Sequence, residues 1–317
     1  MRILVTGGAG FIGSNLVAAL LQHEQVSFVR VLDNLSTGSY HNIEEHNGNP
    51  RFEFVHADIR DYESCLAACE GIDRITHQAA LGSVPRSIND PLTTNAVNIT
   101  GTLNIYTAAK EKKIDRVVYA ASSSTYGDHP GLPKVEDKTG NPLSPYAVTK
   151  LVNELYANVY ASVYDMHFIG LRYFNIFGPR QNPAGPYAAV IPLFAEAILK
   201  NTSPVINGDG SHSRDFTYVD NAVSANILSL FTENKEALNQ VYNIACGEQT
   251  SLVQLFEYLR KEAGSEVQPV HGPGRKGDVK HSLADISKAR KLLGYSPAIS
   301  VAEGLKKTFQ WYKENNG

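Results

Sequence analysis

The sequence predicts an α/β protein in which helices cover both faces of a doubly wound parallel sheet, followed by a smaller lobe. Short apolar runs alternate with longer amphipathic stretches in the first half, and this rhythm is lost after about residue 173. The expected helices lie near 11–22, 61–69, 89–112 and 145–164. The expected strands are Arg2–Thr6, Phe28–Leu32, Phe52–His56, Ile72–His77, Arg116–Ala121 and His167–Arg172.

The second half is expected to form a loop-rich mixed α/β lobe. Gly, Pro and Asn cluster at Phe177–Tyr187, Asn207–Ser213 and His271–Asp278. The strand-like run Val241–Ala245 is expected to return to the sheet. We therefore predict one domain from 1–173 plus about 215–246, and a second from about 174–214 and 247–317.

Composition limits the classes of partner. The 317 residues carry a net charge of -3, so no basic field attracts nucleic acid or an anionic membrane. No apolar run reaches the ~20 residues of a membrane helix. Three cysteines without zinc spacing favour a reducing, cytoplasmic location and predict no metal site.

A glycine-rich turn, Thr6-Gly7-Gly8-Ala9-Gly10-Phe11-Ile12-Gly13, joins the first strand to the first helix. Gly7 permits the tight turn, Gly10 lets the backbone approach a pyrophosphate, and Gly13 lets the helix pack on the strand. The free N–H groups and the dipole of the helix then favour the anion. This context predicts a Rossmann-type dinucleotide site.

An acidic residue, Asp33, ends the second strand twenty positions after Gly13. Its carboxylate is expected to accept hydrogen bonds from the adenosine ribose and to repel a 2′-phosphate. No arginine occurs in Asn34–Gly38, so NAD is favoured over NADP. Asp58 and Ile59, after the third strand, are expected to meet the adenine.

Tyr146 and Lys150 stand one helical turn apart, on one helix face. A tyrosine acting as a base near pH 7 needs its pKa lowered by ~3 units, or ~4 kcal/mol. One cation at ~4 Å in an effective dielectric of ~20 supplies about that amount. Lys150 is expected to provide this charge, and a hydroxyl in Ser122–Gly127 is expected to orient the substrate.

These motifs together resemble the extended short-chain dehydrogenase/reductases, and among them the nucleotide-sugar 4-epimerases. The resemblance runs over nearly the whole chain. It rests on Thr6–Gly13, Asp33–Gly38, His77–Ala80, Ser122–Gly127, Tyr146–Lys150, Leu171–Asn175, Arg214–Phe216 and Arg275–Asp278.

The resemblance implies a catalytic set of Ser122, Tyr146 and Lys150, with Tyr146 as the base. The NAD contacts it implies are Gly7, Gly10, Phe11, Ile12, Gly13, Asp33, Asn34, Asp58, Ile59, Ala79, Ala80, Asn98, Tyr146 and Lys150. The UDP-sugar contacts it implies are Gly82, Ser83, Arg86, Ser122, Ser123, Ser124, Asn175, Ala189, Val190, Asn207, Arg214, Arg275, Asp278 and Ser282.

The implied reaction is epimerisation of a UDP-hexose through a 4-keto intermediate, with NAD taking and returning the hydride. A 4,6-dehydratase is disfavoured because Ser123 and Ser124 occupy the places of its acid pair. A UDP-sugar decarboxylase, which shares the catalytic set, stays open. A non-catalytic NAD sensor or scaffold would be expected to lose Tyr146 or Lys150.

The sugar is expected to be UDP-N-acetylglucosamine, interconverted with UDP-N-acetylgalactosamine. Ser282 falls where UDP-glucose epimerases carry a bulky tyrosine, and a serine leaves room for an acetamido group. UDP-glucose stays open as a substrate, as does UDP-N-acetylhexosaminuronate, whose carboxylate Arg86 could meet. The resemblance also implies a homodimer formed through helices from about 89–112 and 145–164.

Overall fold

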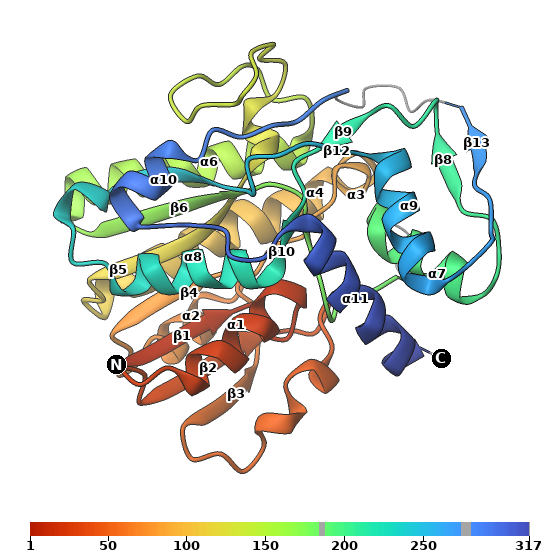
Figure 1. Ribbon diagram of the computed structural model, residues 1–317. Helices are drawn as coiled ribbons and strands as arrows, with labels where there is room; N and C mark the ends of the chain where they lie inside the picture. The colour runs from red at the N-terminus through yellow and green to blue at the C-terminus, as the bar shows by residue number, and fades with distance from the viewer. Residues whose placement is uncertain (184–187, 274–279, 317) are drawn as a thin grey trace.

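A computed structural model describes residues 1–183, 188–273 and 280–316. Its centre is a seven-stranded parallel sheet in the order β11-β6-β5-β4-β1-β2-β3, which confirms the predicted fold class (Figure 1). The strand order reverses between β1 and β4, which is where ligands bind in such sheets. The strands are β1 (Arg2–Thr6), β2 (Phe28–Asp33), β3 (Phe52–His56), β4 (Arg74–His77), β5 (Arg116–Ser122), β6 (His167–Tyr173) and β11 (Gln240–Ile244).

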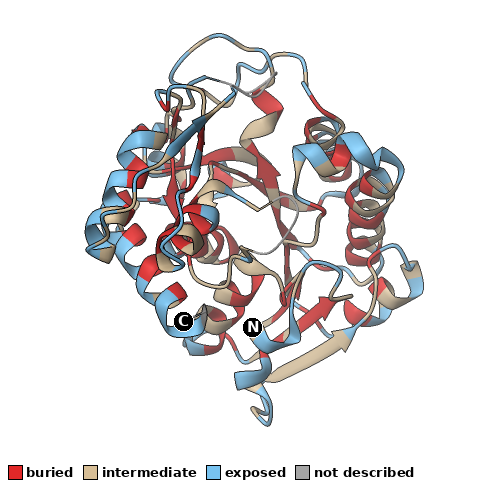
Figure 2. Ribbon diagram, turned by 90° about the vertical axis from the view of Figure 1, so that its right-hand side faces the viewer, coloured by how far each residue is buried: buried red, intermediate tan, exposed pale blue. Residues whose placement is uncertain are grey.

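Helices cover both faces of this sheet, and each face has its own core (Figure 2). Because side chains alternate along a strand, Ile3 and Val5 of β1 pack into one core and Leu4 into the other. The first core includes α1 (Phe11–Gln22) and α8 (Val219–Phe231). The second includes α2 (Tyr62–Ala68), α5 (Thr102–Glu111) and α6 (Pro145–Tyr164).

The helix expected at 89–112 is present from Pro91 to Glu111, with a π-helical turn in its middle and a separate short helix before it. The chain forms α3 (Val84–Asn89), then α4 (Pro91–Asn95), a π-helical turn (Ala96–Gly101) and α5. Asp90 separates α3 from α4 because its carboxylate accepts a hydrogen bond from the Thr93 N–H at 3.0 Å, and Pro91 fits the first helical position. The π turn locally widens the helix at Asn98, whose side chain is hydrogen-bonded to Leu81 and Thr149.

The smaller lobe contains α7 (Val190–Leu199) and α9 (Leu252–Ala263), whose Phe194 and Phe256 rings meet edge to face at 6.0 Å. Helices α10 (Ser287–Leu293) and α11 (Val301–Asn316) follow later in the chain. Among the helices that the structure describes, none is long and apolar enough to cross a bilayer. The remaining strands form pairs, β10 (Thr217–Tyr218) with β7 (Ile176–Phe177), β12 (Thr250–Ser251) with β9 (Ser213–Arg214), and β13 (Val270–Gly272) with β8 (Val205–Asn207).

Two buried polar side chains fasten this lobe to the sheet. Asn243 of β11 accepts from the Tyr126 hydroxyl at 2.6 Å and donates to the carbonyls of Lys134 and Asp285, both at 2.9 Å. The Asp215 carboxylate accepts from the backbone N–H groups of Cys246, Gly247 and Ala284. We propose the predicted division into two domains on the basis of this arrangement, with β11 as the returning strand.

Candidate active site

The glycine turn brings β1 and α1 into backbone contact. Gly7 has a φ of +68°, and a Cβ on Gly13 would lie 2.1 Å from the Gly7 carbonyl oxygen. Helix α1 has no side-chain cap and no acidic residue in its first turn. Its first N–H groups are therefore placed to bind an anion, and the turn fits the pyrophosphate of NAD.

Asp33 lies at the end of β2, next to this turn. One carboxylate oxygen accepts from the Ala9 N–H at 2.9 Å and the other from the Leu35 N–H at 2.8 Å. Burial raises the pKa of Asp33, and these two hydrogen bonds oppose the shift. Each carboxylate oxygen keeps a second lone pair, which is what two ribose hydroxyls require.

Asp58 is fixed on the neighbouring loop by two partners. Asn34 donates to it at 2.7 Å, and Arg60 forms a salt bridge with it at 2.7 Å. Hydrogen bonds from Arg60 are the main cause that lowers the pKa of Asp58 to about 2. The predicted residues Asn34 and Asp58 thus act as one rigid unit beside Asp33.

Helix α6 positions Tyr146 and Lys150. Ser144 caps the helix by accepting from the Ala147 N–H at 3.1 Å, and Pro145 occupies its first turn. Tyr146 is hydrogen-bonded to Ser122, which lies at the carboxyl end of β5. The predicted catalytic residues are therefore gathered at one sheet edge.

The Lys150 ammonium lies near Tyr146 and is bound by a backbone carbonyl. Its Nζ lies 6.0 Å from the centre of the Tyr146 ring and donates to the Ala120 carbonyl at 2.8 Å. Burial raises the pKa of Tyr146, with the hydrogen bond to Ser122 opposing the shift. Burial also lowers the pKa of Lys150 to about 8. The role of Lys150 in stabilising the Tyr146 phenolate stays a prediction.

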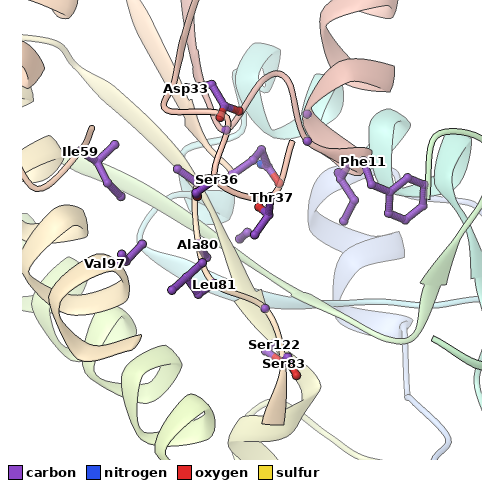
Figure 3. Close-up of a pocket in the computed structure, with 18 of the residues that line it drawn as sticks. Phe11, Asp33, Ser36, Thr37, Ile59, Ala80, Leu81, Ser83, Val97 and Ser122 are labelled. Carbon is purple, nitrogen blue, oxygen red and sulfur yellow. The ribbon is translucent and has the colours of Figure 1, made fainter. Parts of the chain in front are cut away.

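These side chains line a cavity of about 520 Å³, a size typical of ligand sites. Figure 3 shows Asp33 at one end and Ser122 with Ser83 at the other. The predicted substrate residues Gly82, Ser123 and Asn175 also line it. The predicted cofactor residues in its wall are Gly7, Gly10, Phe11, Ile12, Gly13, Asp33, Asn34, Asp58, Ile59, Ala79, Ala80, Tyr146 and Lys150.

Asn98 lies behind this wall, fully buried in the π turn. Its amide oxygen accepts from the Leu81 N–H at 2.8 Å, and its nitrogen donates to the Leu81 carbonyl at 3.2 Å and to Thr149 at 3.1 Å. Asn98 therefore links the backbone of Leu81 to α6 through hydrogen bonds. Val97, its neighbour, lines the cavity instead.

A second cavity, of about 550 Å³, adjoins the first. Asn175 and Ile176 border both cavities. Asn175 follows β6 with a φ of +40°, a strained conformation for a residue with a side chain. The predicted substrate residues in the second wall, besides Asn175, are Ala189, Val190, Asn207 and Arg214.

The other predicted substrate residues lie outside both walls or outside the described chain. Arg86 lies in α3, where its backbone N–H donates to the Ser83 hydroxyl. The Ser124 hydroxyl donates to the Ser122 hydroxyl. Ser282 is half-buried, and its N–H donates to the Ser213 carbonyl at 3.1 Å, next to Arg214. Arg275 and Asp278 fall in the range 274–279, outside the described residues.

The sequence analysis missed a buried polar network beneath the Tyr146 end of the first cavity. The Tyr173 hydroxyl donates to Gln78 at 3.0 Å and accepts from Asn226 at 2.7 Å. Gln78 in turn donates to Thr76 and Asn226. The sequence contained one indication of this network: the polar residues Thr76 and Asn226 lie inside apolar runs. Polar side chains that are buried in this way need hydrogen-bond partners.

Comparison with known proteins agrees with this geometry. Residues 3–245 match the model of the NAD dependent epimerase/dehydratase family. The chain therefore belongs to this family, as predicted, and NAD is its cofactor.

Individual relatives are similar over their full length. A putative UDP-glucose 4-epimerase of Methanocaldococcus jannaschii is 40% identical over 316 residues, with 99% of each chain covered. A UDP-N-acetylglucosamine 4-epimerase of Methanobrevibacter ruminantium, solved with UDP-N-acetylmuramic acid, is 39% identical with a TM-score of 0.93, covering 99% of this chain and 98% of that one. A UDP-glucuronic acid 4-epimerase of Bacillus cereus, solved with UDP-glucuronic acid and NAD, is 34% identical with a TM-score of 0.92, covering 99% and 100%.

Replacing Gly13 with alanine is expected to abolish stable NAD binding. The added Cβ collides with the Gly7 carbonyl, a backbone atom that cannot move without opening the turn. The measurement is NAD released from purified, heat-denatured protein, per mole of chain. Gly48→Ala is the control: it strains the exposed backbone at a φ of +80°, but its Cβ meets nothing within 4 Å, so it shows the cost of a strained alanine without a collision. Full NAD content in Gly13→Ala would contradict the assigned role of the turn.

Replacing Tyr146 with phenylalanine is expected to lower kcat by about 10²–10⁴-fold, because it removes the hydroxyl that is predicted to exchange a proton with the substrate. NAD content should match the wild type, since the ring and Ser122 remain. Turnover is followed with each candidate UDP-sugar at saturating concentration. A near-normal kcat would show that another group is the base.

Proposed function

We propose that this chain interconverts UDP-N-acetylglucosamine and UDP-N-acetylgalactosamine by inverting carbon 4 of the sugar. The protein is an NAD-dependent nucleotide-sugar 4-epimerase. One observation carries the proposal: the hydrogen-bonded pair Tyr146 and Ser122 lies in a cavity whose far end holds Asp33, and a second cavity containing Arg214 adjoins it at Asn175.

The roles of the residues follow from this placement. Arg214 in the second cavity suits a diphosphate, because a guanidinium matches phosphate oxygens with charge-assisted hydrogen bonds. The sugar of a nucleotide held there reaches towards Ser122 and Tyr146. Ser122 orients the 4-hydroxyl, Tyr146 takes and returns its proton, and the Lys150 ammonium stabilises the phenolate. Bound NAD supplies reversible hydride transfer, so the sugar passes through a 4-keto intermediate.

The acetylated sugar is favoured by Ser282 and by a relative. The backbone N–H of Ser282 donates to the Ser213 carbonyl, which places Ser282 beside Arg214. A serine at this position is smaller than the tyrosine that the resemblance gives to UDP-glucose epimerases. The Methanobrevibacter ruminantium relative is named for the acetylated sugar, whereas other relatives are named for UDP-glucose and UDP-glucuronic acid. UDP-glucose is therefore the second candidate. A UDP-uronate, either UDP-N-acetylhexosaminuronate or UDP-glucuronic acid, is the third.

We further propose a homodimer formed through α4 and α6. Val148, Leu155, Val159 and Val163 form one stripe on α6, and each is 45–63% exposed. Leu92 of α4, which packs beside α6, is 82% exposed. A contiguous apolar stripe of this kind is typical of subunit interfaces. A cytoplasmic location stays a prediction from the three free cysteines.

The experiment that tests the proposal is proton NMR of the purified protein with UDP-N-acetylglucosamine, UDP-glucose or UDP-glucuronic acid, without added NAD. The expected result is the galacto anomeric signal, appearing fastest from the acetylated sugar. Faster conversion of UDP-glucose or the uronate would keep the reaction and overturn the assigned sugar. Conversion of none, even with NAD added, would overturn the reaction.

Replacing Ser282 with tyrosine is expected to reduce kcat/KM for the acetylated sugar by about tenfold or more relative to UDP-glucose, because a pocket discriminates by exclusion. Ser282→Ala is the matched control and should leave the ratio unchanged. Both sugars are measured with the same preparation. An equal loss on both would show that Ser282 does not contact the 2-substituent.

A further inference from the structure

Lys150 has a carboxylate one helical turn away on the side opposite Tyr146. Tyr146, Lys150 and Glu154 are spaced at i, i+4 and i+8 on α6, so they lie along one face. Lys150 and Glu154 are only 4% and 5% exposed. A buried ammonium and a carboxylate at this spacing would ordinarily pair directly.

The Glu154 carboxylate instead binds Arg172 through both oxygens. Arg172 Nε donates to Oε1 at 2.9 Å and Nη2 donates to Oε2 at 2.7 Å, a bidentate geometry. Arg172 is itself fixed, since its Nη1 donates to the Glu136 carbonyl at 3.0 Å and its guanidinium lies 4.8 Å from the centre of the Tyr126 ring. The Lys150 Nζ therefore donates to the Ala120 carbonyl of β5, the strand that also carries Ser122.

The charge of Glu154 still acts on Lys150. Burial is the larger influence on the pKa of Lys150, lowering it to about 8, and Glu154 acts in the opposite direction. Lys150 is therefore charged below about pH 8 and becomes neutral above it. The Glu154 carboxylate keeps the pKa of Lys150 higher than burial alone would.

Among the described residues, the histidine and the tyrosines packed around the pair keep one charge state near pH 8. Burial lowers the pKa of His77, on β4, to about 3, so the imidazole is neutral. Burial raises the pKa of Tyr173, beside the cavity, and of Tyr126, under Arg172, to about 12. The pKa values of Tyr106 on α5, Tyr119 on β5 and Tyr146 are likewise raised by burial.

Glu136 is the other carboxyl near Arg172. Its side chain accepts from the Asn243 N–H at 2.9 Å, and burial raises its pKa. Arg172 is one of the charges that oppose this rise, whereas the pKa of Lys150 is shifted by burial and by Glu154. Glu154 is thus the acidic side chain whose charge bears on the Lys150 ammonium.

We propose that Glu154 and Arg172 form a positioning pair for Lys150: the carboxylate stabilises the buried ammonium, and the guanidinium prevents that carboxylate from drawing the ammonium away from Tyr146. The inference rests on the proposed function, in which the Lys150 charge stabilises the phenolate. Neither residue touches substrate or cofactor in this role. The pair sets the pH range in which Lys150 is charged, and it keeps the ammonium near Tyr146.

The first test is the pH dependence of kcat/KM for Glu154→Gln, measured from pH 6 to pH 10 with the UDP-sugar that the enzyme converts. Loss of the carboxylate is expected to move the alkaline limb to lower pH by about one unit, a tenfold loss above the limb. Glu257→Gln is the matched control, because Glu257 is paired with Arg260 on the surface of α9. An unmoved limb in active Glu154→Gln would overturn the proposal.

Arg172→Lys tests the second half of the proposal. A lysine ammonium lacks the planar fork that binds both carboxylate oxygens, so Glu154 is held less firmly and one of its oxygens competes with the Ala120 carbonyl for Lys150. The alkaline limb should then move to higher pH while kcat falls at every pH. Movement in the same direction as in Glu154→Gln would contradict the shielding role of Arg172.

Glu154→Gln leaves a buried guanidinium uncompensated and can fail to fold for that reason. The double variant Glu154→Met with Arg172→Met avoids this, because paired apolar side chains replace a buried ion pair at little cost. It should fold and show the same downward shift of the alkaline limb. Failure of the double variant to fold would overturn the proposal, because it would assign the pair to stability alone.

A direct titration separates this inference from the proposed reaction. The ¹³Cε signal of Lys150 is followed by NMR in holoprotein with labelled lysine and is assigned by its loss in Lys150→Met. Its midpoint should fall by about one pH unit in Glu154→Gln, whether or not any sugar is converted. An unshifted midpoint would overturn the inference, whereas a shifted midpoint without conversion of any sugar would overturn only the reaction.

Discussion

The parallel direction of the central strands is the constraint on which the site depends. The carboxyl ends of β1, β4, β5 and β6 meet at one edge of the sheet, because every strand runs the same way. Gly7, Ala79, Ser122 and Tyr173 therefore come together although they are spread over the first half of the chain. Helix α6 then lays Tyr146 and Lys150 across this edge. No single segment of the sequence contains a site of its own.

Local patterns predicted the sheet well because a strand leaves a short-range signature. Six expected strands agree with β1 to β6 to within two residues at each end, since each is an apolar run bounded by polar or glycine residues. The glycine turn was predictable for a similar reason: its close contact with Gly13 requires a residue without a side chain. The helix expected at 89–112 begins at Pro91, where Asp90 caps it, and the π-helical turn inside it was not predicted.

The finer chemistry of the site was less predictable because it depends on neighbours that are distant in sequence. Spacing placed Lys150 near Tyr146 but could not reveal that Nζ binds the Ala120 carbonyl. The resemblance implied Asn98 as a cofactor contact but not the hydrogen bonds that its amide makes with Leu81 and Thr149. Burial and competing hydrogen-bond partners decide such roles, and both are set by the tertiary structure.

The fastening of the smaller lobe has a consequence for how the protein is made. The Asp215 carboxylate lacks one of its hydrogen-bond donors until Ala284, 69 residues further along the chain, has been synthesised. β11, the partner of β6, is likewise synthesised only after the segment that carries α7 and α8. At roughly 5–20 residues per second, the open edge of β6 is exposed for several seconds on the ribosome. During that time the growing chain presents an unpaired strand edge, the feature that most readily captures other chains.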